Sequence, residues 1–168
     1  MVETTSQDRT WAAIAHLSTL LTLLVGVCSG GIGGMIFIVI PWAIYLSFKN
    51  HSRFVAYHAA QALALQLAAT AGWLVATLLG ALALALLWTV TGILCIILVG
   101  ILLIPVMVLV SVGFAAIVVL APLAFGGYAI VGAVEAGNGK DYDYPWIGQA
   151  VRNWMTRRGK SATANAMP

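Results

Sequence analysis

Charged residues interrupt this apolar chain at only three places. All thirteen Asp, Glu, Lys and Arg residues lie within 3–9, 49–53 and 135–160. The two intervals between them, 10–48 and 54–134, carry no formal charge. A helix needs about 20 apolar residues to cross a bilayer. The first interval therefore fits two short spans, and the second fits two long spans or up to four crowded ones.

The basic residues predict the topology. Cytoplasmic loops collect Lys and Arg, and each of the three charged clusters contains them. If all three clusters lie on the cytoplasmic side, each uncharged interval crosses the membrane an even number of times. This favours four spans with both termini in the cytoplasm and leaves six as the alternative.

Composition supports a membrane protein. The chain is 62% hydrophobic and 8% charged, whereas soluble domains are about 45–50% apolar and about 25% charged. A soluble fold of 168 residues could not bury this much apolar surface. We predict an all-α, polytopic integral membrane protein with about four transmembrane helices and a C-terminal interfacial amphipathic helix.

The first half of the chain divides into two spans. A polar tail, 1–8, contains Thr5 and Asp8 at capping-box spacing, which indicates a helix start. The first span covers about 10–27, and four glycines within 28–34 predict a tight turn. The second span covers about 34–48, and Pro41 within it predicts a kink.

A third helix is expected from Arg53 to about Trp88, and small residues repeat along it every four positions. Small side chains let helix backbones approach closely in lipid. We predict that this stripe packs on another helix of the chain or on another protomer. Its members are Ala60, Ala64, Ala68, Gly72, Ala76 and Gly80.

The segment from 88 to 134 is too long for one straight crossing. Residues 88–92 resemble a turn at the outer surface, and the fourth crossing is expected over about 108–134. The residues between, 89–107, would form a broken helix, a surface-lying segment or a re-entrant piece. Four and six crossings both remain open here.

The C-terminal segment changes character. Pro145 suits the first position of a helix, and apolar residues from Ile147 to Trp154 follow helical spacing. We predict an interfacial helix over 145–158 and a disordered tail over 159–168, which leaves 9–144 as the transmembrane domain. The residues expected to contact lipid headgroups are Arg152, Arg157 and Arg158.

Candidate chemistry is sparse. His58, Gln61 and Gln66 share one broad side of the third helix, where they line a polar pathway or form hydrogen bonds between helices. Of the three histidines, two or three could meet near the cytoplasmic side, although none has metal-ligand spacing. No catalytic motif stands out. We predict no enzyme activity, no cofactor, no metal site and no nucleic-acid partner.

Four short segments together resemble a known family. They are Arg9-Thr10-Trp11 with His16-Leu17, Pro41-Trp42, the run from Ser52 to Ala62, and Gly137 to Lys140 leading to Tyr144-Pro145. In this order they resemble the Tic-twenty-like family of small bacterial membrane proteins, which is related to the plastid inner-envelope import component. The resemblance implies a four-helix membrane fold with both termini on one side, and no catalytic residues.

The expected role is structural or accessory. The protein would lie in the bacterial cytoplasmic (inner) membrane and assemble through its small-residue faces with itself or with other membrane-protein subunits. Its partners would be the lipid bilayer and those subunits. The alternative is a component of a protein-translocation or small-molecule transport pathway.

Overall fold

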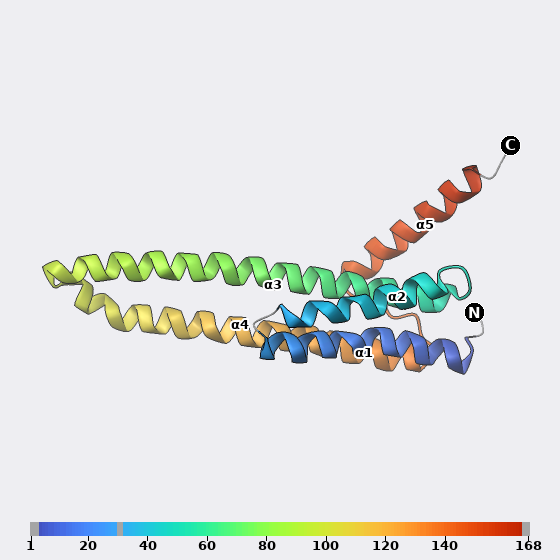
Figure 1. The fold of residues 1–168 in the computed structure, drawn as a ribbon, viewed down its shortest axis with the longest axis horizontal. Helices are drawn as coiled ribbons and strands as arrows, with labels where there is room; N and C mark the ends of the chain where they lie inside the picture. The colour runs from blue at the N-terminus through green and yellow to red at the C-terminus, as the bar shows by residue number, and fades with distance from the viewer. Residues whose placement is uncertain (1–3, 30–31, 166–168) are drawn as a thin grey trace. The chain divides into compact units, whose positions relative to one another are not determined.

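The described part of the chain is helical. The computed structural model describes residues 4–29 and 32–165, with side chains described as far as Arg158. No β-strand occurs within those two ranges, which confirms the all-α prediction. The elements are α1 (Ser6–Cys28), the 3-10 helix η1 (Gly33–Ile38), α2 (Val39–Phe48), α3 (Arg53–Leu94), the 3-10 helix η2 (Cys95–Ile97), α4 (Val99–Gly137) and α5 (Ile147–Asn165) (Figure 1).

Among the described residues, three stretches are long and apolar enough to cross a membrane. They are Ser6–Cys28, Arg53–Ile97 and Val99–Gly137. A fourth apolar stretch, Gly33–Phe48, is shorter. The described residues therefore contain three helices that are long and apolar enough to span a membrane, and the predicted number of about four crossings stays a prediction.

A capping box begins α1. The Thr5 hydroxyl accepts a hydrogen bond from the Asp8 N–H at 3.1 Å, and the Thr5 N–H donates to the Asp8 carboxylate at 3.1 Å. Two backbone donors that lack helical partners are thereby satisfied, which confirms the predicted helix start. At its other end α1 stops at Cys28, where the glycine-rich turn is expected; Gly30 and Gly31 of that turn lie outside the described residues.

The 3-10 helix η1 packs directly on the backbone of α1. Gly34 is buried, and a Cβ atom added to it would lie 2.3 Å from the Thr22 carbonyl oxygen and 3.0 Å from the Gly26 nitrogen. A side chain at this position would push the two elements apart. The glycine therefore sets the close approach of η1 to α1.

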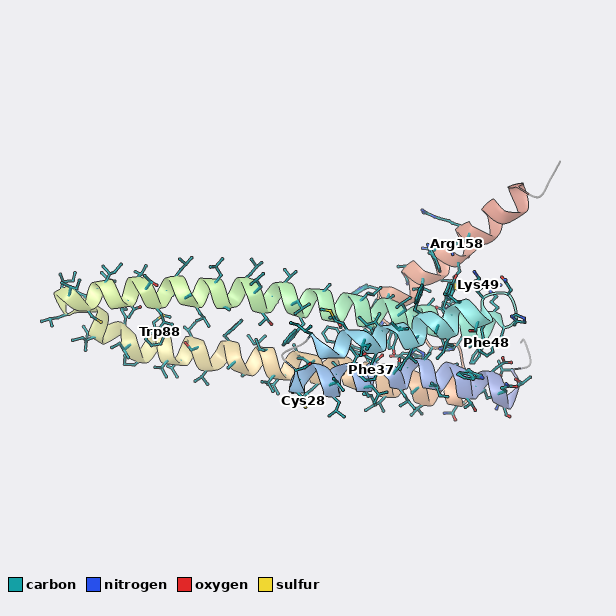
Figure 2. The ribbon with its side chains drawn as sticks, in the orientation of Figure 1. Cys28, Phe37, Phe48, Lys49, Trp88 and Arg158 are labelled. Atoms are coloured by element: carbon teal, nitrogen blue, oxygen red, sulfur yellow. The ribbon has the colours of Figure 1, made fainter. Side chains whose placement is uncertain are left out.

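Pro41 is the third residue of α2 and lies within the continuous helical stretch Gly33–Phe48, because η1 passes directly into α2 at Val39. Proline removes one backbone hydrogen bond from this stretch. The geometry changes from 3-10 to α-helical at Val39, two residues before Pro41, and the expected kink stays a prediction. Lys49 and the loop after it follow Phe48 (Figure 2).

The turn expected at 88–92 is wrong. α3 continues through this region to Leu94, and the chain reverses at η2 and Leu98, whose φ of 67° is left-handed. Thr89 and Thr91 do not break the helix, because their hydroxyls donate to the carbonyls four residues earlier, each at 2.8 Å. This local bonding satisfies a polar group inside an apolar helix.

Residues 89–107 therefore match the expectation of a broken helix, because α3 ends at Leu94 and α4 begins at Val99. α4 begins at Val99 and passes Pro105 and Pro122 without a break, so it contains the whole of the expected fourth crossing over about 108–134, whose bounds stay a prediction. Proline is tolerated in membrane helices where neighbouring groups compensate for the lost hydrogen bond.

The chain forms two compact units. The first comprises 1–69 and 125–168, and the second comprises 70–124. In the second unit α3 and α4 pack as a hairpin, with the Trp73 indole donating to the Val118 carbonyl at 2.9 Å. In the first unit fully buried alanines let α1, α3 and the end of α4 pack closely: Ala12, Ala15, Ala59, Ala62 and Ala136.

Within the first unit, α5 packs on α3 through its apolar side. Val151 is buried against Tyr57 and Ala60 of α3, and Ile147 packs at the same place. α5 continues through Gly159 to Asn165, so the expected helix end at Gly159 is wrong. Residues 166–168 of the expected disordered tail lie outside the described residues.

Candidate functional site

The polar residues of the first unit meet in a buried cluster. Nε2 of His16 lies 3.0 Å from Nδ1 of His58, and Nδ1 of His16 lies 2.8 Å from the Tyr144 hydroxyl. All three side chains are almost completely buried. The prediction that two histidines meet is confirmed for this pair, while His51 lies apart in the exposed loop and contacts the Ser47 carbonyl.

A glycine on α4 makes room for this chain of hydrogen bonds. A Cβ atom on Gly132 would lie 2.6 Å from the Tyr144 hydroxyl oxygen and 3.1 Å from Nδ1 of His16. α1, α3, α4 and the segment before α5 therefore converge on one point. Burial also raises the pKa of the Tyr144 hydroxyl, so this group stays neutral and can donate.

Gln61 holds the segment that joins α4 to α5. Its Nε2 donates to the Tyr142 carbonyl at 2.9 Å, and its Oε1 accepts from the Tyr144 N–H at 3.0 Å. One side-chain amide thus replaces the backbone partners that a non-helical segment lacks. We call Gln61, His58, His16 and Tyr144 the polar clamp.

Gln66 makes a separate contact one turn further along α3. Its Nε2 donates to the hydroxyls of Ser18 at 2.9 Å and Thr19 at 3.1 Å. Two atoms of these side chains, Oε1 of Gln66 and Nε2 of His58, are buried without a hydrogen bond of normal geometry.

The sequence places His58, Gln61 and Gln66 on one side of a helix, but it does not identify what they contact. In the structure they face α1 and the segment before α5. Neither the groove nor the small pocket described below is lined by any of the three. Their contacts match the hydrogen-bonding interpretation, and a polar lining of a pathway stays a prediction.

An ion pair anchors the start of α5. The Arg152 guanidinium contacts the Asp143 carboxylate at 2.5 Å and lies 5.0 Å from the centre of the Tyr57 ring, and the Tyr57 hydroxyl also donates to Asp143. Burial raises the pKa of Asp143, but the hydrogen bonds from Tyr57 and Arg152 and the charge of Arg152 outweigh it, so the pKa lies below its usual value. A small pocket of about 100 Å³ beside this group is lined by Arg53, Asp141 and Arg152 among others.

This pair makes the attachment of α5 sensitive to acid. A carboxylate with a lowered pKa stabilises the folded state above its unfolded pKa of about 4, and that contribution is lost as the pH falls through the folded value. We expect α5 to loosen below about pH 4, as measured by the fluorescence of Trp154. Asp143→Asn should loosen α5 at neutral pH and remove the dependence, whereas Asp141→Asn should keep it. A transition unchanged in Asp143→Asn would contradict this.

The three arginines expected at headgroups have different surroundings. Arg152 is held by Asp143, and Arg158 lies 4.7 Å from the centre of the Trp154 ring. Arg157 is exposed. Direct contact of these arginines with headgroups therefore remains a prediction. Arg152 already forms an ion pair with Asp143.

The small-residue stripe is divided between different surroundings. Ala60 is buried under α5, and in the second unit the Phe114 ring lies over Gly80. Ala68, Gly72 and Ala76 are exposed within the single chain, and a Cβ atom on Gly72 would meet nothing within 4 Å. Ala64 is partly buried.

The described residues show no arrangement typical of a metal centre. No three His, Cys, Asp or Glu side chains among them lie close enough to hold an ion. Cys28 and Cys95 are both free thiols. The polar side chains described above form hydrogen bonds and an ion pair that hold helices together.

A family model described as "Magnetosome magnetite crystal formation protein family" matches residues 7–151. The match extends from α1 into α5 and includes the whole polar clamp. No curated protein and no solved structure matches the chain. The resemblance to the Tic-twenty-like family is therefore wrong. The short segments on which that resemblance rested contain His16, His58, Gln61 and Tyr144. Here these side chains hold helices together, and side chains with that role are weak evidence of family membership.

Proposed function

The chain belongs to the magnetosome magnetite crystal formation protein family, and on this premise we propose that it is a non-enzymatic membrane protein with a structural or accessory role in crystal formation. The family description supplies the process. The polar clamp supports a structural role, because its side chains bond to one another and to the backbone. The proposed location is a bacterial membrane that surrounds or supplies the growing crystal.

The surface of the second unit is the observation that carries an assembling role. Its side chains are apolar and project outward from both helices, with Leu78, Leu102 and Leu109 all more than 70% exposed. In both long spans, only 6% of the most apolar window is buried within the chain. Lipid or other protein must cover this surface. Self-association or inclusion in a larger membrane complex would provide such cover.

Deletion and complementation in a magnetosome-forming host would test the proposal. We expect the protein in the magnetosome membrane fraction, and we expect its deletion to change the size or number of magnetite crystals seen by electron microscopy. The full chain should restore them. Unchanged crystals in the deletion strain, or absence of the protein from that fraction, would contradict the proposal.

We further propose four crossings with both termini in the cytoplasm. α3 and α4 contain no turn between their ends, so we count one crossing for each. At about 1.5 Å per residue both helices are longer than the about 30 Å of the hydrocarbon core, so each must tilt or continue beyond it. Gly33–Phe48 is short, but six residues of 3-10 helix rise about 2.0 Å each and ten of α-helix about 1.5 Å each. The stretch is therefore about 27 Å long by these rises, close to the about 30 Å of a hydrocarbon core. The 3-10 geometry thus supports a second crossing.

Thiol labelling would test this topology. The background for the test is a variant with Cys28→Ser and Cys95→Ser. In it we expect Asn50→Cys to react with a membrane-impermeant maleimide only after the membrane is permeabilised, because Asn50 would face the cytoplasm. Ser29→Cys should react from the opposite side. The reason is that the stretch Gly33–Phe48 separates the two positions by one proposed crossing. Reaction of both from the same side would contradict four crossings.

Gly72 provides a test of assembly. We propose that the exposed part of the stripe contacts another protomer or subunit, so Gly72→Leu should convert the oligomer to smaller species on native gels. Within one chain the new side chain enters open space, so the fold should persist. Gly113→Leu on α4 is the matched control, because a Cβ atom there also meets nothing within 4 Å. Equal migration of both variants and the parent would argue against this face.

The transport alternative makes a different prediction. A passage lined by His58, Gln61 and Gln66 would lose flux in liposomes when the three are replaced by leucine. The structural role proposed here predicts lower stability in that variant, and no flux in the parent protein. Flux in the parent that the replacement abolishes would favour transport.

A further inference from the structure

An apolar groove of about 490 Å³ lies in the first unit, between α2, α3 and α5. Its size is within the about 300–1,000 Å³ of sites that bind small ligands. Leu46, Leu63 and Leu67 contribute aliphatic side chains to its walls, and Trp42 and Trp154 contribute aromatic ones. The groove therefore suits a flexible hydrocarbon.

Small residues keep this groove open. Ala60 and Ala64, the first two members of the small-residue stripe, line it on α3. Ala60 is used by the contact with Val151, but Ala64 is only partly buried. A large side chain at Ala64 would fill the space. The stripe thus has a second use here besides close packing of helices.

The charge at the groove is of one sign. Arg158 is the single charged residue among those that line it, and Figure 2 shows this side chain on α5. α5 contains four basic residues and no acidic one. Trp154 and Arg158 lie together, as aromatic and basic side chains do at the level of lipid headgroups. An occupant with an apolar chain and a negative group complements these features.

We propose that the groove binds an anionic phospholipid, with an acyl chain against Leu46, Leu63 and Leu67 and the phosphate near Arg158. Two of the walls belong to the apolar helices α2 and α3, so a membrane lipid reaches the groove without leaving the bilayer. The ion pair between Asp143 and Arg152 holds α5 in place as one wall. Bound lipid would therefore fix α5 to the membrane surface.

Competition between two lipids tests the site. The purified full-length chain is reconstituted with equal amounts of phosphatidylglycerol and phosphatidylcholine that carry identical acyl chains, and the retained lipid is measured by native mass spectrometry. We expect a preference for phosphatidylglycerol that falls about fivefold in Arg158→Gln. Arg157→Gln is the matched control, since Arg157 is exposed on the same helix and does not line the groove; its preference should fall by clearly less than in Arg158→Gln.

A second variant separates the groove from the surface. Ala64→Phe should lower the retention of both lipids, because the ring occupies the acyl-chain space. Equal loss of preference in the two arginine variants would overturn the proposal in favour of diffuse attraction to α5. Unchanged lipid retention in a folded Ala64→Phe protein would overturn the proposal as well. If Ala64→Phe instead lost an oligomer and kept its lipid, the groove would hold a second copy of the chain, and the proposal would again be overturned. If Ala64→Phe does not fold, the two arginine variants decide.

Discussion

Replacing Gln61 by leucine is expected to lower the free energy of unfolding by about 2–4 kcal/mol. The substitution removes both hydrogen bonds that hold the segment before α5, and it leaves the Tyr142 carbonyl and the buried Tyr144 N–H without partners. An unsatisfied buried group costs about 1–3 kcal/mol. The unfolding of the reconstituted protein by denaturing detergent in mixed micelles would measure the change.

Two other glutamines provide controls for Gln61→Leu. Gln149→Leu changes an exposed residue of α5 and should be nearly neutral. Gln66→Leu should cost less than Gln61→Leu, because it leaves hydroxyls rather than backbone groups, and the Ser18 hydroxyl keeps its bond to the Ala15 carbonyl at 2.7 Å. If Gln61→Leu is no more costly than Gln66→Leu, the polar clamp does not hold the segment as inferred.

Gly34→Ala is expected to destabilise the first unit by about 1–3 kcal/mol, the usual cost of forcing an extra group into a packed interior. The added methyl would lie 2.3 Å from the Thr22 carbonyl oxygen and 3.0 Å from the Gly26 backbone. These are main-chain atoms, which no side-chain rotation can move. η1 must shift away from α1, and thermal unfolding in detergent would report the loss.

The same substitution elsewhere should have the opposite sign. Gly113→Ala and Gly92→Ala place a methyl in open space on a helix, and alanine is about 1 kcal/mol better than glycine within a helix. We expect both variants to be as stable as the parent or more stable. A Gly34→Ala protein as stable as the Gly113→Ala protein would show that η1 does not rest on the backbone of α1.

The candidate site shows where prediction from sequence stops. Helical spacing is enough to place His58 and Gln61 on one side of α3. Their partners could not be predicted, because those of Gln61 lie more than 80 residues further along the chain and that of His58, His16, lies on another helix. Gly132 and the ion pair between Asp143 and Arg152 were missed for the same reason. A glycine within an apolar helix, such as Gly132, gives no signal in the sequence that another side chain lies against it. The opposite charges of Asp143 and Arg152 could have been considered as a pair.

The sequence by itself determined that this is a helical membrane protein, where its charged clusters lie, and where α1 begins. Those properties are local, since hydropathy adds along a segment and a capping box needs only four consecutive residues. Only the tertiary structure decided where α3 reverses, which atoms the polar clamp joins, and which members of the small-residue stripe are covered. Those outcomes depend on contacts between distant segments, because a buried polar group bonds to whatever partner the packing of helices brings near it.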